Sequence, residues 1–229
     1  MNLEIIYEDN DIILCRKPAG VATQTKRLGQ QDMESLLKNY RAKKGEPPYI
    51  GVVHRLDQPV EGLMVFAKNQ KAAAGLSKQI QGRMIGKHYY AMSASIPIEK
   101  EGVLENYLVT DKKSNYTSVV DVRQGKTLPD DAKKAVLEYK VIAQKDGLTL
   151  FDILLHTGRQ HQIRVQMAHM GCPLIGDEKY GSGAKNLRGG KGQLALCSYR
   201  LEFVHPAIGK KMDFSIKPEG GNFKILNIR

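Results

Sequence analysis

The chain has 229 residues, of which 41% are hydrophobic and 26% charged, which is typical of a folded globular protein and not of a disordered one. Lysine and arginine outnumber aspartate and glutamate by 35 to 24, so the formal net charge is +11. This surplus favours a polyanionic partner, although many basic proteins bind nothing in particular. No apolar run reaches the roughly 18 to 20 residues of a membrane span, and the N-terminus lacks a secretory signal. We therefore expect a cytoplasmic protein.

The three cysteines, Cys15, Cys172 and Cys197, are dispersed along the chain and form no CxxC pair. This spacing argues against a disulfide framework and against a zinc site. We interpret all three as buried small apolar side chains.

In the first part of the chain, residues 3–7 and 12–15 are expected to form two short strands around a polar turn, and a loop follows at 17–20. The spacing of four apolar side chains between residues 33 and 40 predicts an amphipathic helix. The apolar run 62–67 fits a buried strand. Asn69 is the expected N-cap of a helix that ends near residue 81.

The second part is expected to be richer in strands, at residues 87–96, 135–142, 148–155, 193–203 and 211–216. One more helix carries Ile163, Met167 and Met170, with Gly171 at its C-terminal stop. Strands outnumber helices and do not alternate regularly with them. This order indicates an α+β fold, with a mixed, largely antiparallel central sheet flanked by helices and loops, in a single domain that spans residues 1–229.

The segment 54–68, HRLDQPVEGLMVFAK, places an acid at the end of a tight polar stretch that leads into the buried strand. A carboxylate is easily held in one position there, so Asp57 is a candidate catalytic residue. For an isolated aspartate, a turn cap is the commoner explanation.

The segment 83–91, RMIGKHYYA, would place alternate residues from Arg83 to Ala91 on one face of a strand. Tyr89 can offer a flat surface to a nucleobase and a polar tip to its edge, with Lys87 beside it. An ordinary half-buried strand has the same pattern.

The segment 156–180, HTGRQHQIRVQMAHMGCPLIGDEKY, turns at residues 157–159 from a strand into the helix that carries Gln162 and Arg164. A helix N-terminus with an arginine suits an anion, either an RNA phosphate or a partner carboxylate. The histidines lack the spacing of metal ligands, so no metal site is predicted for His156, His161 or His169.

These three segments, with residues 10–20 and 194–206 (LALCSYRLEFVHP), resemble the RluA-like family of pseudouridine synthases over nearly the whole chain. HRLD followed by GLMVFAK, and TGRQHQIR followed by GCPLIGDEKYG, are too specific for both to agree by chance. The resemblance implies the pseudouridine synthase catalytic fold and an isomerase that converts uridine to pseudouridine in rRNA or tRNA. It also implies an RNA stem-loop as partner, and we expect a monomer.

The resemblance also implies roles for individual residues. Asp57 would be the essential aspartate, and Tyr89 would stack on the target base and help proton transfer. Arg164 would pair with the aspartate, and Arg55 would fill the gap left by the swung-out nucleotide. RNA contacts are expected from His54, Lys87 and Arg159, and from Lys185, Arg188 and Lys191 in the glycine-rich run 181–192, for which a solvated loop is an equal alternative.

Several positions depart from the pattern of the family. Many relatives have a basic residue and then a Thr-Ser pair where this chain has residues 58–61, QPVE, and histidines where it has Gln166 and Cys172. These changes bear on substrate choice and loop shape more than on activity. Many relatives also carry an N-terminal S4-type RNA-binding domain, and we expect none here.

Forming pseudouridine breaks the bond between ribose C1′ and uracil N1, turns the base and rejoins it through C5. The reaction is redox-neutral, so no cofactor is expected, and the sequence contains neither GxGxxG nor a P-loop. A buried carboxylate needs a nearby cation to stay ionised, and Arg164 is the candidate. Attack of Asp57 on C1′ and removal of a proton from C2′ to give a glycal both remain open from the sequence.

Two other functions fit parts of the pattern. A non-catalytic RNA-binding module is disfavoured because Asp57, Tyr89 and Arg164 are all present. A hydrolase that uses His54 with Asp57 is disfavoured because no nucleophile elbow is present and no serine or cysteine stands beside a base.

Overall fold

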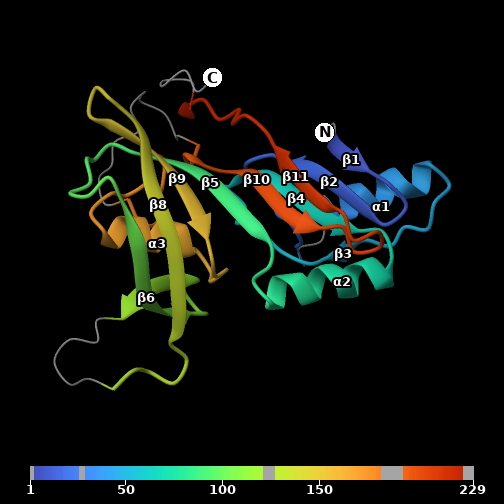
Figure 1. Ribbon diagram of the computed structural model, residues 1–229, viewed down its shortest axis with the longest axis horizontal. Helices are drawn as coiled ribbons and strands as arrows, with labels where there is room; N and C mark the ends of the chain where they lie inside the picture. Colours follow the sequence, from blue (N-terminus) through green and yellow to red (C-terminus); the bar gives the residue numbers. More distant parts are fainter. Residues whose placement is uncertain (1–2, 26–28, 121–126, 182–192, 224–229) are drawn as a thin grey trace. The chain divides into compact units, whose positions relative to one another are not determined.

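The computed structural model describes residues 3–25, 29–120, 127–181 and 193–223. The chain divides into two compact units, Met1–Lys87 with Cys197–Pro218 and His88–Leu196 with Glu219–Arg229. Figure 1 shows that the first unit therefore combines the blue-to-green part of the ribbon with a red segment from near the C-terminus. No helix among these residues is both long enough and apolar enough to span a membrane.

In the first unit the neighbouring strands follow the order β1, β2, β4, β10, with β11 beside β10 and β3 beside β4. The pair of β4 and β10 is parallel, and the other pairs are antiparallel. The strands are β1 (Glu4–Glu8), β2 (Ile12–Lys17), β3 (Gly51–Val52), β4 (Glu61–Ala67), β10 (Leu196–Val204) and β11 (Lys211–Ser215).

The core of the first unit lies under β2 and β4, whose residues are all buried. Ala72 and Leu76 of the helix α2 (Gln70–Gln81) pack into it with Leu14 and Val65. Each such leucine or valine contributes roughly 1.5–3 kcal/mol by leaving water. The predicted cap is confirmed, because Asn69 Oδ1 accepts from the N–H of Ala72 at 2.8 Å.

The other helix of this unit is α1 (Met33–Lys43), which begins at a capping box. Asp32 Oδ1 accepts from the N–H of Ser35 at 2.7 Å, and Ser35 Oγ accepts from the N–H of Asp32 at 3.2 Å. Two otherwise unpaired backbone donors are thereby satisfied. The helix holds Met33 and Leu37 in the interior, as the helical spacing predicts.

In the second unit the strands follow the order β5, β9, β8, β6, β7, and all these pairs are antiparallel. The helix α3 (Gln162–His169) packs Val165 against Leu108, Ala135 and Tyr180. The strands are β5 (Gly86–Ser93), β6 (Glu101–Asp111), β7 (Tyr116–Val120), β8 (Lys133–Lys145) and β9 (Leu148–Leu155).

The predicted α+β class, with largely antiparallel strands, is confirmed, and the expectation of a single domain stays a prediction. Three strands were not expected from the sequence, namely β3, β6 and β7. One expectation was wrong in detail. Arg83 has a φ of 55° and follows the end of α2, so it does not lie on the face of a strand that begins only at Gly86.

Candidate active site

Asp57 lies on a tight turn between β3 and β4 in the first unit. Its carbonyl oxygen accepts a hydrogen bond from the N–H of Val60 at 3.0 Å. The chain enters the buried strand β4 at Glu61, and the Asp57 side chain itself is half-buried. One end of the turn is therefore anchored in the sheet.

The residues on both sides of Asp57 are tied to the segment that follows β2. Thr23 Oγ1 accepts from the N–H of Leu56 at 3.2 Å and donates to the Leu56 carbonyl at 3.0 Å. The N–H of Gly20 donates to the carbonyl of Gln58 at 2.8 Å, and Gln58 Nε2 donates to the Gly20 carbonyl at 2.9 Å. Each such bond is worth about 1 kcal/mol. Together they restrict how far Asp57 can move.

Lys17 lies at the centre of this arrangement, with none of its surface exposed. Its ammonium donates to the carbonyls of Pro18, Val21 and Gln58 at 3.1, 2.7 and 3.0 Å. Burial lowers the pKa of Lys17 to about 7, while the carboxylates of Asp57 and Glu61 act in the opposite direction. Within the first unit, Lys17 is therefore a cation that interacts with Asp57.

His54 supports β4 and is held neutral. Its Nε2 accepts from the N–H of Val65 at 3.1 Å, so the ring proton is on Nδ1. Burial lowers the pKa of His54 to about 4, and the positive charge of Lys87 acts in the same direction. Burial also lowers the pKa of Lys87. Of the residues expected to contact RNA here, Arg55 is exposed and Lys87 is half-buried.

Tyr89 lies on β5, in the second unit, opposite Ile153 of β9. It is 5% exposed, and Ala91, two residues further along, is buried as well. Because β5 is continuous through both residues, Tyr89 and Ala91 lie on the same face of the strand, as expected. The Tyr89 side chain is buried, so the ring is held by its surroundings.

Arg164 projects from α3 and forms a two-pronged ion pair with Asp177. Its Nε and Nη2 lie 2.8 and 2.7 Å from the two carboxylate oxygens, and the two side chains are 8% and 0% exposed. Burial alone would raise the pKa of Asp177, but the hydrogen bond and charge of Arg164 outweigh it and leave this pKa below its usual range. The guanidinium also lies over the ring of Tyr180, 5.2 Å from its centre. Arg164 is thus fixed in orientation.

The turn before α3 is closed by its own side chains. Gln162 Oε1 accepts from the hydroxyl of Thr157 at 2.8 Å and from the N–H of Arg159 at 3.0 Å. Arg159 Nε donates to the Lys134 carbonyl at 3.0 Å, and its side chain is half-buried. The predicted passage from strand to turn to helix is confirmed. Lys185, Arg188 and Lys191 lie outside the described residues.

A family model described as RNA pseudouridylate synthase matches residues 11–169.

The chain belongs to this family.

Two curated relatives agree with the assignment to RNA pseudouridylate synthases. The uncharacterized RNA pseudouridine synthase YhcT of Bacillus subtilis is 34% identical over 89% of this chain, which spans 65% of that relative. The dual-specificity RNA pseudouridine synthase RluA of Vibrio vulnificus is 36% identical over 89% of this chain, which spans 78% of it. The solved structure of human RNA pseudouridylate synthase domain containing 4 matches with a TM-score of 0.77 at 22% identity, covering 94% and 89% of the two chains, and shows the shared fold.

The expected family is therefore confirmed, and with it the isomerase class and RNA as the partner. Two residues were missed as members of the candidate site. Asp177 stands in the GDEKY stretch, where an acid thirteen positions after Arg164 was visible. Lys17 stands in KPAG, for which the sequence predicts a loop. The sequence feature that indicates a buried lysine here is its place at the end of an apolar strand.

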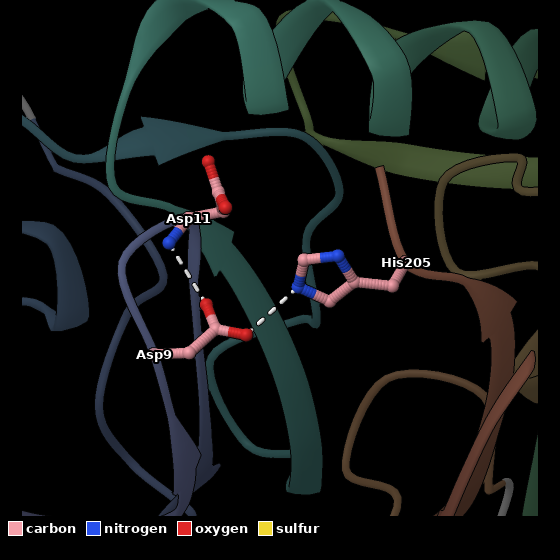
Figure 2. Close-up of side chains that lie close together, drawn as sticks. All are labelled: Asp9, Asp11 and His205. Carbon is pink, nitrogen blue, oxygen red and sulfur yellow. Dashed lines mark hydrogen bonds and ion pairs between the residues drawn. The ribbon is translucent and has the colours of Figure 1, made fainter. Parts of the chain in front are cut away.

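Three side chains of metal-ligand type also meet in the first unit, with ligand atoms within 4.8 Å of one another: Asp9, Asp11 and His205. Figure 2 shows Asp9 between the other two. Asp9 Oδ1 accepts from the N–H of Asp11 at 2.8 Å, and Asp9 Oδ2 accepts from His205 Nε2 at 2.8 Å. His205 Nδ1 accepts from two backbone N–H groups, at Ala207 and Ile208. Protein donors thus occupy these atoms, and the cluster joins the β1–β2 turn to the β10–β11 hairpin.

Proposed function

We propose that this chain isomerises uridine to pseudouridine in RNA, with Asp57 as the catalytic carboxylate. The observation that carries the proposal is the turn that presents Asp57. Of its two neighbours, Leu56 is held by two hydrogen bonds and Gln58 by three, and the carbonyl of Asp57 itself closes the turn. A carboxylate fixed in this way keeps the geometry that a reaction at one ribose carbon requires.

The chemistry needs one carboxylate and no net redox change. The glycosidic bond from C1′ to N1 breaks, the detached uracil turns, and C5 bonds to C1′. The proton on C5 is then lost, and N1 gains one. Asp57 serves either as the nucleophile at C1′ or as the base at C2′, and both routes place its carboxylate under the sugar.

Tyr89 and Arg164 complete the proposed catalytic set because of the family resemblance. Tyr89 stacks on the uracil and assists proton transfer, and the burial of its ring favours one orientation. Arg164 supplies a positive charge for Asp57, and its pairing with Asp177 limits the rotamers it can adopt. Removing one partner of a buried ion pair costs about 3–5 kcal/mol, so Arg164 variants should also lose stability.

The proposed substrate is a stem-loop of rRNA or tRNA, whose uridine leaves the stack to reach Asp57. Swinging out a base costs a few kcal/mol. Arg55 is exposed and long enough to fill the vacated space. His54, Lys87 and Arg159 are the further proposed RNA contacts. An rRNA substrate draws support from relatives named ribosomal large subunit pseudouridine synthases.

The test begins with transcriptome-wide mapping of pseudouridine in cells with and without the gene, which identifies the target RNA by the sites that vanish. On that RNA, Asp57→Ala should keep its affinity and form no product, because binding does not need the carboxylate and the reaction does. Turnover and RNA affinity are measured on purified protein.

A matched control is Asp11→Asn, another half-buried aspartate of the same unit. The Asp11 carboxylate accepts from Asn69 at 2.8 Å, and an amide oxygen can accept the same bond. This variant should turn over like the wild type. Normal turnover by Asp57→Ala would remove Asp57 from the reaction, and an unchanged map would count against the isomerase.

A further inference from the structure

A buried ammonium group, that of Lys17, has no part in the chemistry proposed above. Lysine is rarely buried completely, because moving its charge out of water is unfavourable unless hydrogen bonds replace the lost hydration. Lys17 is 0% exposed, at the end of the core strand β2. Its charge therefore calls for a local explanation.

The hydrogen bonds of Lys17 match the donors of its protonated form. Three carbonyl oxygens, of Pro18, Val21 and Gln58, lie 3.1, 2.7 and 3.0 Å from Nζ. A neutral amine has only two N–H groups, and its lone pair would face the third oxygen. Three acceptors match the three N–H groups of an ammonium. This geometry favours the charged form of Lys17 in the folded protein.

The three carbonyls belong to two separate segments, and Lys17 joins them. Pro18 and Val21 lie in the loop after β2. Gln58 lies 41 positions after Lys17 and is the residue that follows Asp57 in the sequence. The Gln58 carbonyl also accepts from the N–H of Gly20. The ammonium therefore ties the residue that follows Asp57 to the loop after β2, in addition to the hydrogen bonds between Thr23 and Leu56.

Lys17 also places a positive charge where it interacts with the carboxylates at the Asp57 turn. The carboxylates of Asp57 and Glu61 both interact electrostatically with its ammonium. In a buried setting such an attraction is stronger than in water. Asp57 thus has a source of positive charge in its own compact unit, independently of Arg164.

We propose that Lys17 is the positioning residue of Asp57, whose buried ammonium binds the Gln58 carbonyl and holds the carboxylate in the orientation the reaction needs. The proposal rests on the proposed function in one respect, that Asp57 is the reacting group. The hydrogen bonds and the charge exist whether or not the reaction is the one proposed.

The first experiment compares Lys17→Met, which keeps an unbranched side chain one atom shorter and removes the charge, with the wild type on the mapped RNA. A displacement of about 1 Å can lower a rate by about two orders of magnitude. We expect kcat to fall at least roughly 30-fold, with KM and RNA affinity within about threefold of the wild type. Lys17→Gln keeps two N–H donors without the charge, and should lose at least roughly tenfold in kcat.

The matched control is Lys68→Met. Lys68 is also a buried lysine of the first unit, 7% exposed, but it pairs with Glu8 and Glu46 at 2.8 and 3.0 Å. Its loss removes a buried charge without touching the Asp57 turn. We expect a lower unfolding free energy and a kcat within about threefold of the wild type.

A second measurement does not depend on activity. Hydrogen exchange reports the N–H groups of Gly20 and Val60, which donate to Gln58 and Asp57. In Lys17→Met both amides should exchange at least roughly tenfold faster, and in Lys68→Met they should not. This readout separates failure of the positioning role from failure of the proposed function, because it applies even if no pseudouridine is formed.

Three results would overturn the proposal: a kcat of Lys17→Met within about threefold of the wild type, an equal loss in Lys68→Met, or unchanged exchange at Gly20 and Val60. If Lys17→Met does not fold, Lys17→Gln decides alone. Wild-type turnover by that variant would then reject the role.

Discussion

At the scale of single residues, His54 couples the protonation of one ring to the stability of β4. Its Nε2 accepts from the N–H of Val65, which protonation would prevent. Burial lowers the pKa of His54 to about 4, below its unfolded value near 6.5. Between these two values the unfolded chain binds more protons than the folded one. The stabilising effect is therefore present above pH 6.5 and is lost as the pH falls towards 4.

This predicts that the wild type loses up to about 3 kcal/mol of unfolding free energy between pH 7 and pH 4 on account of His54. His54→Gln keeps an acceptor for Val65 but does not titrate, so this component should vanish. Urea unfolding of both proteins at several pH values measures the difference, in which other titrating groups cancel. The same pH dependence in both proteins would contradict the assignment.

At the scale of elements, the parallel pairing of β4 with β10 depends on Gly62. This residue lies opposite Ser198 and has a φ of 135°. A Cβ there would lie 2.4 Å from the Ser198 carbonyl oxygen and 2.5 Å from its nitrogen. Both atoms belong to the backbone and cannot rotate away. The two strands therefore require glycine at this position.

Gly62→Ala should lower the unfolding free energy by roughly 3 kcal/mol or more, because backbone strain and a steric clash act together. The loss should extend to turnover, since β4 follows the Asp57 turn directly. Thermal or urea unfolding provides the measurement. Gly221→Ala is the control, because a Cβ at Gly221 meets nothing within 4 Å and should change stability little. Equal stability of the two variants would contradict the prediction, because it would show that β10 can move far enough from β4 to accommodate the added Cβ.

At the scale of the whole molecule, the net charge of +11 predicts RNA binding that weakens with salt. Lys185, Arg188 and Lys191 are the proposed source of part of this effect. For single-stranded RNA, losing three phosphate contacts should flatten the slope of log affinity against log salt by about 2. Affinity of the triple glutamine variant, measured at several salt concentrations, checks this value.

A charge-matched control separates local contact from total charge. Lys100, Lys113 and Lys145 are all exposed, and replacing them with glutamine removes the same three charges. If both triple variants flatten the slope equally, the effect belongs to the net charge and not to the run 181–192.

The sequence alone determined those features of this protein that depend on local chemistry. Asn69 caps α2, Gly171 follows α3 with a φ of 87°, and β9 occupies the expected residues 148–155. Each follows from neighbours along the chain, by a hydrogen bond to nearby backbone, by a positive φ, or by a run of mostly apolar residues. The motif around Asp57 and the family followed from the sequence in the same way, because the motif is contiguous.

Only the tertiary structure decided the strands and partners that depend on distant residues. β6 contains Gly102, Asn106 and several acids, and along it only Leu108 is buried. Its stability comes from pairing with β7 and β8, which no local pattern reveals. Likewise, Arg164 finds Asp177, and Lys17 reaches Gln58 across 41 positions. A side chain's charge can be read from its letter, but the group that balances the charge is set by which segments the fold brings together.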